Sequence, residues 1–126
     1  MDLQKINAIK ERLQYEREHR TEIIIERMQN MQPFTDEFIP EPPIIDKEIY
    51  EKYVIPNFIR CGAIPKDKLV KGKRYYGSCR NASEAVWLGD EFEYIRYKFG
   101  DTFPERINHF QDDDGYDVFV PIRELD

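Results

Sequence analysis

The chain of 126 residues lacks the features of a membrane-spanning protein or of an exported, disulfide-rich protein. No apolar run approaches the ~20 residues that a transmembrane helix requires. The first twelve residues, MDLQKINAIKER, contain no apolar core of a signal peptide. Only two cysteines are present. We therefore expect a cytoplasmic protein whose two thiols are reduced.

Motifs of the common cofactor and metal sites are also missing. The sequence contains no GxxxxGK, GxGxxG, GxSxG, HExxH or CxxC, which are typical of phosphate loops, dinucleotide sites, serine hydrolases and zinc sites. Residues 112–115 do not begin an EF-hand, because Phe110 and Pro121 would occupy positions that need carboxylates. We expect no metal and no cofactor, and the sequence favours a protein that is not an enzyme.

The chain has no excess of positive charge either. Lys and Arg number 19 against 25 Asp and Glu, a net charge of −6. Residues 1–30 hold six acids and six bases, whereas residues 73–126 hold twelve acids and seven bases. Nucleic-acid coating needs a basic excess, so we do not expect direct nucleic-acid binding. The acidic C-terminal third of the chain would suit a basic surface on a partner protein. The candidate partner-binding residues are Glu91, Glu93, Asp112, Asp113, Asp114 and Asp117.

An apolar pattern with helical spacing predicts one long helix over residues 2–31. Apolar residues recur at intervals of three and four up to residue 13, a polar waist follows over 14–22, and the pattern then resumes. No Pro or Gly interrupts the segment. We predict that this helix assembles a homo-oligomer; docking of the helix on its own domain is the alternative. The oligomerisation candidates are Leu3, Ile6, Ile9, Leu13, Ile24 and Met28.

Prolines dominate the next segment, residues 32–46, and predict a semi-extended linker. It carries too many apolar side chains for a free tether, so we expect it to lie on a surface. Asp46 is a suitable N-cap for a short helix that should end before Pro56. These boundaries divide the chain into a helical segment (1–31), a linker with a short helix (32–56) and a β domain (57–126).

Short strands are predicted from residue 73 onward, over 73–79, 83–88, 91–99 and 116–122. Residues 102–110 are ambiguous, because Pro104 is unsuited to a central strand. The sequence thus predicts an α+β fold: a long N-terminal helix, a Pro-rich linker, a short helix, and a small antiparallel sheet of four or five strands that can curl into a half-barrel.

Strict alternation over residues 91–99 places two cations on the same face as two aromatic rings. With Arg80 on a neighbouring strand end, this face would form a cationic concavity for an anionic, nucleotide-like small molecule. A solvated face paired with Glu84, Glu91 or Glu93 is the alternative. The ligand-binding candidates are Arg80, Asn81, Trp87, Tyr94, Arg96 and Lys98.

A cysteine beside a cation offers a third, enzymatic hypothesis. Cys79 precedes Arg80, and a nearby cation lowers a thiol pKa. Catalysis would also need a base, for which His109 is the candidate. The competing interpretation is a buried thiol that packs as a small apolar group.

The C-terminal half of the chain contains GKRYYGSCRNASEAVW (72–87), KFG (98–100), His109 and DDDGYDVFVP (112–121). Together they resemble a pattern of small uncharacterised phage and bacterial proteins to which no activity is attached. The resemblance implies a common small domain and no particular chemistry. Our leading hypothesis is a non-enzymatic cytosolic interaction module, for example a phage-encoded inhibitor or regulator of a host protein that acts through its acidic surface. The alternatives are a binder of an anionic nucleotide-like molecule and a cysteine-dependent enzyme.

Overall fold

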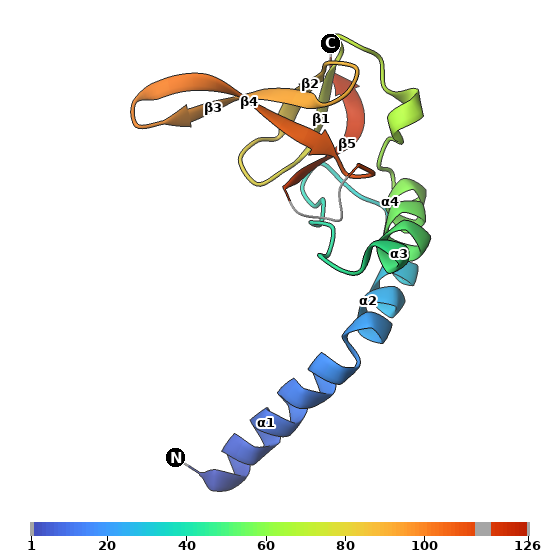
Figure 1. The fold of residues 1–126 in the computed structure, drawn as a ribbon, viewed down its shortest axis with the longest axis vertical. Helices are drawn as coiled ribbons and strands as arrows, with labels where there is room; N and C mark the ends of the chain where they lie inside the picture. The colour runs from blue at the N-terminus through green and yellow to red at the C-terminus, as the bar shows by residue number, and fades with distance from the viewer. Residues whose placement is uncertain (1, 113–116, 126) are drawn as a thin grey trace.

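The structure is a computed structural model that describes residues 2–112 and 117–125. Helices fill the N-terminal half and five strands the C-terminal half, so the predicted α+β fold is confirmed (Figure 1). The helical elements are α1 (Leu3–Glu18), α2 (Arg20–Gln29), α3 (Lys47–Ile49), a π-helical turn η1 (Tyr50–Val54), α4 (Ile55–Arg60) and a short 3₁₀ turn η2 (Lys66–Lys68). The strands are β1 (Arg74–Ser78), β2 (Glu84–Trp87), β3 (Phe92–Lys98), β4 (Asp101–His109) and β5 (Val118–Leu125).

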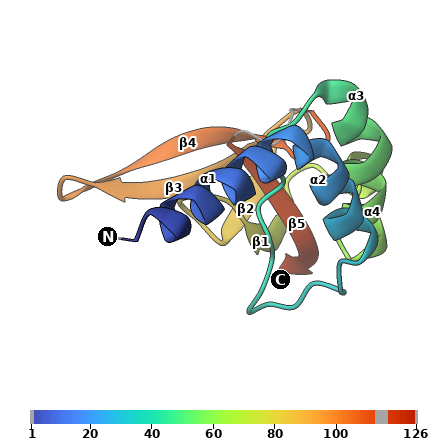
Figure 2. The same ribbon diagram turned by 90° about the horizontal axis from the view of Figure 1, so that it is seen from below.

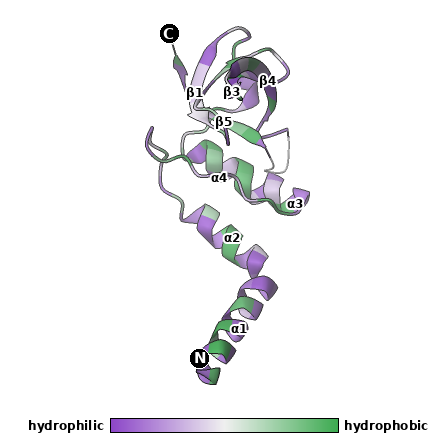
Figure 3. Ribbon diagram, turned by 90° about the vertical axis from the view of Figure 1, so that its left-hand side faces the viewer, coloured by the Kyte–Doolittle hydropathy of each residue, from purple (hydrophilic) through white to green (hydrophobic). Residues whose placement is uncertain are grey.

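The N-terminal segment forms two helices rather than the single predicted helix. The break is at His19, whose backbone leaves the helical region at φ −109° and ψ 17°. It falls in the polar waist of the sequence, where the His19 ring lies 4.3 Å from the Tyr15 ring and 3.0 Å from the Glu22 carboxylate but no residue is buried. Before it, α1 projects away from the folded body, whereas α2, beyond it, packs on that body (Figures 1 and 3).

The proline linker lies on the protein surface, as predicted, and is held there by specific contacts. The Phe34 ring packs edge-on against Phe58 with centroids 5.1 Å apart. The Arg123 guanidinium donates two hydrogen bonds to the Asp36 carboxylate, at 3.2 and 2.9 Å. Ile45 is buried, so the linker contributes to the core as well as covering it.

The short helix begins at its predicted cap but does not end where predicted. The Asp46 side chain accepts a hydrogen bond from Glu48 N–H at 3.0 Å. The chain continues through the π-helical turn, and Pro56 enters the first turn of α4. Proline is tolerated in a first turn because its missing N–H needs no partner there. The carbonyl oxygen of Tyr53 accepts a hydrogen bond from the Asn57 side chain at 2.7 Å.

The five strands close into a small barrel in the order β1-β2-β3-β4-β5. Four of the pairings are antiparallel, but β4 and β5 pair in parallel over Asn108–Val118 and His109–Phe119, so the sheet is mixed. Pro104 lies in the part of β4 that pairs with β3 alone. A residue without an N–H is accepted at such an edge.

Two apolar cores share β5 as a common wall. Val118 and Val120 pack in a helical core with α2, η1 and α4, whereas Phe119 packs in the barrel core with Trp87 and Phe92. Successive residues of a strand point to opposite faces, so a single strand can serve both cores. The helical core consists of Ile24, Met28, Ile45, Tyr50, Val54, Phe58, Ala63, Phe110, Val118 and Val120.

Candidate functional site

A hydrogen-bonded polar cluster joins β3 to β4. The Tyr94 hydroxyl donates to Glu105 at 2.5 Å, and Arg96 donates to the other Glu105 oxygen at 2.9 Å. The Asn81 amide lies 3.5 Å from the Tyr94 oxygen. Arg96 is therefore paired, and its partner is a carboxylate of the adjacent strand rather than one of the three glutamates expected from the sequence.

The pKa shifts of Glu105 and Tyr94 favour the hydrogen bonds and the ion pair that hold this cluster together. Hydrogen bonding from Tyr94 and Arg96 lowers the pKa of Glu105 below its usual value. Burial, together with the hydrogen bond to Glu105, raises the pKa of Tyr94 to about 12. Near neutral pH the cluster thus holds a neutral phenol, a carboxylate and a guanidinium, which bind one another.

The six ligand-binding candidates do not form one concavity. Asn81, Tyr94 and Arg96 meet in the polar cluster. Trp87 is only 3% exposed, with its ring 4.9 Å from Phe92, so it packs in the barrel core and offers almost no open ring face for stacking. Lys98 is exposed beside the Phe99 ring. Arg80 lines a different cleft, described below.

Cys79 and His109 do not form a catalytic pair. Burial raises the pKa of Cys79, whose thiol lies 3.4 Å from Ala82 O. His109 is fully buried; its Nε2 is 2.9 Å from Ile64 O, and its Nδ1 accepts from Gln111 N–H at 3.1 Å. Burial lowers the pKa of His109 to about 4. Since both ring nitrogens bind main-chain groups, neither is free to accept the Cys79 proton.

Three of the four described acidic candidates form ion pairs, two of them with the same arginine. Arg106 pairs with Glu91 at 3.1 Å and with Glu93 at 3.7 Å. Asp112 pairs with Lys66 at 2.8 Å. Asp117 lines the cleft that contains Arg80. The remaining two candidates, Asp113 and Asp114, lie outside the described residues.

The oligomerisation candidates divide between the two N-terminal helices. Ile24 and Met28 of α2 are 6% and 4% exposed and belong to the helical core, so in a single copy of the chain they present almost no surface to a partner. Their apolar face is covered by the protein itself. On α1, by contrast, no residue is buried, and Figure 3 shows apolar segments along this projecting helix. Its candidates are Leu3 (70% exposed), Ile6 (half-buried), Ile9 (58%) and Leu13 (51%).

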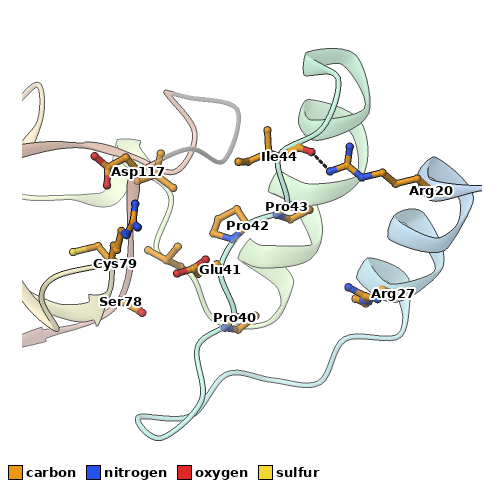
Figure 4. A pocket seen from close by; sticks show the side chains of 13 residues that line it. Arg20, Arg27, Pro40, Glu41, Pro42, Pro43, Ile44, Ser78, Cys79 and Asp117 are labelled. Carbon is orange, nitrogen blue, oxygen red and sulfur yellow. Dashed lines mark hydrogen bonds between the residues drawn. The ribbon is translucent and has the colours of Figure 1, made fainter. Parts of the chain in front are cut away.

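Two further surfaces were missed by the sequence analysis. The outer face of the β3–β4 hairpin exposes Ile95, Tyr97 and Phe99, and the strict alternation of this strand already separated them from the buried face. The second surface is a cleft of about 660 Å³ lined by α2, the proline linker and the end of β1 (Figure 4). Arg20 and Arg27 of α2 line it together with Arg80; their spacing of seven places the first two on one helix face.

Comparison of the chain with known protein families, with curated proteins and with solved structures found no match. None of the helices within the described residues is both long enough and apolar enough to span a bilayer. Residues 2–112 and 117–125 contain no group of three or more His, Cys, Asp or Glu side chains arranged to hold a metal ion.

Proposed function

We propose that this protein is a non-enzymatic interaction module that forms a homodimer through α1. The observation that carries the proposal is the uncovered apolar stripe of that helix, Leu3, Ile6, Ile9 and Leu13. Contiguous exposed apolar surface is typical of protein–protein contact sites. The arrangement of Cys79 and His109 supports the non-enzymatic part, because neither group is poised for nucleophilic catalysis.

A second copy of the chain is the occupant that this stripe suits. Residues 1–30 carry equal numbers of acids and bases, so two copies bring no net repulsion to the contact. The stripe also continues into a groove whose apolar lining residues include Leu13, Ile23 and Ile44, and whose rim carries the charged residues Glu16, Arg17, Arg20 and Arg27. Leu3, Ile6, Ile9 and Leu13 all precede the break at His19, so an antiparallel pair of copies would bring the stripes of the two α1 helices together.

The dimer should be weak and dependent on concentration. The apolar stripe spans fewer than two heptads, whereas a stable isolated coiled coil sustains its pattern over roughly three or four. The groove beside Ile44 adds apolar contact, but the polar waist at Glu16 and Arg20 interrupts it. We expect a monomer–dimer equilibrium in the micromolar range, about −8 kcal/mol.

Sedimentation velocity over a concentration series tests this proposal with two matched variants. Ile9→Asp places a charge on the stripe and should abolish the dimer. Ala8→Asp places the same charge on the opposite face of α1 and should leave the dimer intact. Both positions are exposed, so the folded body should be unaffected, which circular dichroism verifies. A wild-type protein that remains monomeric at the highest concentration, or equal loss in both variants, would contradict the proposal.

The surface for a different partner protein is better sought on the β3–β4 hairpin than on the acidic residues. The described carboxylates among the candidates at 91, 93 and 112 are engaged in ion pairs. The hairpin, which projects beyond the barrel (Figure 2), exposes Ile95, Tyr97 and Phe99 at 65%, 72% and 93%. A phage origin and action on a host protein stay predictions.

A further inference from the structure

The β3–β4 hairpin has one outer edge that no other strand covers. β3 pairs with β4 along its whole length, but β2 is paired with it only at Phe92 and Glu93. Within the part of the chain that the structure describes, β3 therefore has no neighbouring strand on its second side from Tyr94 to the tip of the hairpin. The hairpin projects beyond the barrel in Figure 2, and Ile95 and Tyr97 are 65% and 72% exposed at this edge.

The main-chain groups of Ile95 and Tyr97 point toward this open side. In an antiparallel ladder, every second residue directs both its N–H and its C=O to the same neighbouring strand. The carbonyl of Glu91 points to the side of β2, because it accepts a hydrogen bond of 2.8 Å from Leu88 N–H. Every second residue onward faces the same side, as the pairing of Glu93 with β2 shows. Ile95 and Tyr97 thus present their N–H and C=O groups beyond the point where the β2 ladder ends.

The opposite edge of the hairpin, along β4, is closed to an added strand. Thr102 stands opposite Tyr97 and Pro104 opposite Ile95, so the main-chain groups of these two β4 residues point away from β3. Pro104 has no N–H to offer, and the N–H of Thr102 donates to the Asp101 carboxylate at 2.8 Å. Proline on an edge strand prevents pairing with another chain. The hairpin is therefore protected along β4 and open along β3.

The side chains along the open edge favour one kind of segment. Ile95 and Tyr97 form an apolar outer face. On the other face, β3 carries two cations and β4 two carboxylates. These residues are Arg96 and Lys98 on β3, and Asp101 and Glu105 on β4. A strand added to β3 would therefore meet the two cations directly, while the carboxylates would lie one strand further away.

We propose that the open edge of β3 binds an extended segment of a partner protein, which adds to the sheet as a further strand. Main-chain hydrogen bonds give such strand addition its affinity, and alternate side chains give it specificity. The segment has two apolar residues at alternate positions, which pack on Ile95 and Tyr97, and an acidic residue between them, which lies across from Arg96. The proposal rests on the role of the protein as an interaction module, but it shares no residue with the α1 stripe.

A second copy of β3 suits this edge less well than an acidic segment does. In an antiparallel pair of copies that joins Ile95 of each copy to Tyr97 of the other, the two Arg96 side chains would stand directly opposite each other. Like charges at directly opposite positions destabilise a sheet.

Titration of the full chain with the peptide acetyl-Thr-Val-Glu-Val-Thr-amide, followed by amide NMR shifts, tests the proposal. The peptide should bind with a Kd of about 1 mM or less, and the amides of Ile95 and Tyr97 should shift most. Methylating the nitrogens of both valines removes the N–H groups that would face β3, and should weaken binding about tenfold or more. Methylating instead the nitrogens of the glutamate and the second threonine, which would face water, should leave the affinity within about twofold.

Two substitutions at one position provide the matched test on the protein. Ile95→Pro removes a main-chain donor from the open edge and should weaken binding several-fold, whereas Ile95→Val keeps the donor and should bind as the wild type does. Ile95 is exposed and its N–H faces away from β4, so the proline variant should fold, which thermal unfolding verifies. If that variant does not fold, the two methylated peptides decide the question.

Each outcome supports or overturns a stated part of the proposal. Equal binding of the two methylated peptides, or no shift at Ile95 and Tyr97, would overturn strand addition. A peptide with lysine in place of glutamate should bind several-fold more weakly, and equal affinity would overturn the acidic requirement. Ile9→Asp should lose the α1 dimer and yet bind the peptide with unchanged affinity, so failure of the dimer and failure of the strand site are distinguishable.

Discussion

The two N-terminal helices both carry apolar residues at helical spacing, but their environments are opposite. In α2, Ile24 and Met28 are buried against η1 and α4. The Arg60 guanidinium reinforces this docking by donating to the carbonyl oxygens of Met28 and Met31, both at 3.2 Å, near the end of α2. In α1 the apolar face touches no other element that would bury it. Apolar periodicity thus identifies the helix face that favours burial, but it does not identify the surface that buries it.

The isolation of α1 has an energetic consequence. A helix of 16 residues is marginal in water when nothing packs against it. Its local support consists of the Asp2 cap and exposed side-chain pairs such as Arg12–Glu16 at 3.3 Å, and such pairs contribute only about 0.3–0.5 kcal/mol. In the proposed dimer, pairing with a second copy would supply the missing stabilisation, so the helical content of α1 should rise with protein concentration.

Truncating one apolar side chain in each helix should give the largest difference between α1 and α2 in the free energy of unfolding. Met28→Ala leaves a cavity in the helical core and should lower the free energy of unfolding by about 2–5 kcal/mol. Leu13→Ala removes an exposed side chain and should change it by less than about 0.5 kcal/mol in the monomer. Urea unfolding at low protein concentration, followed by Trp87 fluorescence, measures both.

The same experiment tests whether the two cores unfold together. Trp87 reports on the barrel core, whereas Met28 lies in the helical core, and β5 contributes to both. The transition seen by Trp87 should therefore shift in the Met28 variant. An unchanged Trp87 transition would mean that the shared strand does not couple the cores, and an equal cost for Leu13→Ala would mean that α1 is covered after all.

Lowering the pH should reduce the free energy of unfolding of the folded body on which α2 packs. The reduction should be somewhat smaller than the largest effect expected of Met28→Ala. Burial lowers the pKa of His109 from 6.5 to about 4 in the folded state. Below pH 6.5 the unfolded chain therefore binds a proton that the folded protein does not, and stability falls as the pH decreases toward 4. The loss should reach about 3 kcal/mol, and stability should be flat just above pH 7.

His109→Gln provides the control for this pH dependence. The substitution removes the titrating group, so the slope of stability between pH 6.5 and 4.5 should become shallower, whatever its effect on the absolute stability. An unchanged slope would show that other groups are responsible. The helical content of α1 should not follow the His109 titration, because His109 packs with Trp87 and Phe92 in the barrel.

Features set by nearby residues could be predicted from the sequence, and features set by strand register could not. The Asp46 cap and the strand at β3 depend on a few neighbouring residues, and both predictions were confirmed. The strict alternation predicted over 91–99 does not reach the end of β3, because Tyr97 and Lys98 are both exposed and Phe99 lies in the turn. The ion pair of Arg96 depends on register. Tyr94 stands opposite Glu105 and Arg96 opposite Phe103, so Arg96 reaches its partner diagonally. No local pattern specifies that offset.

Barrel closure and the arginine cleft were unpredictable for a similar reason. The parallel contact between β4 and β5 involves only two residue pairs, too few to leave a signature in composition. Arg27 and Arg80 are separated by 53 positions along the chain and line one cleft only because α2 docks beside the linker. Spacing placed Arg20 and Arg27 on one helix face, but only the fold determines what that face meets.

The two aspartate caps offer the smallest and most closely matched test of the difference between a free helix and a docked one. Asp2 and Asp46 each accept one hydrogen bond of 3.0 Å from the N–H two residues on. Asp46→Ala should lower the free energy of unfolding by about 1 kcal/mol, because α3 leads directly into the packed η1 and α4. Asp2→Ala should leave the global transition unchanged and reduce only the helical circular dichroism signal at low protein concentration. Equal effects on the global transition would show that α1 unfolds with the body, and that its apolar stripe is covered within a single copy of the chain.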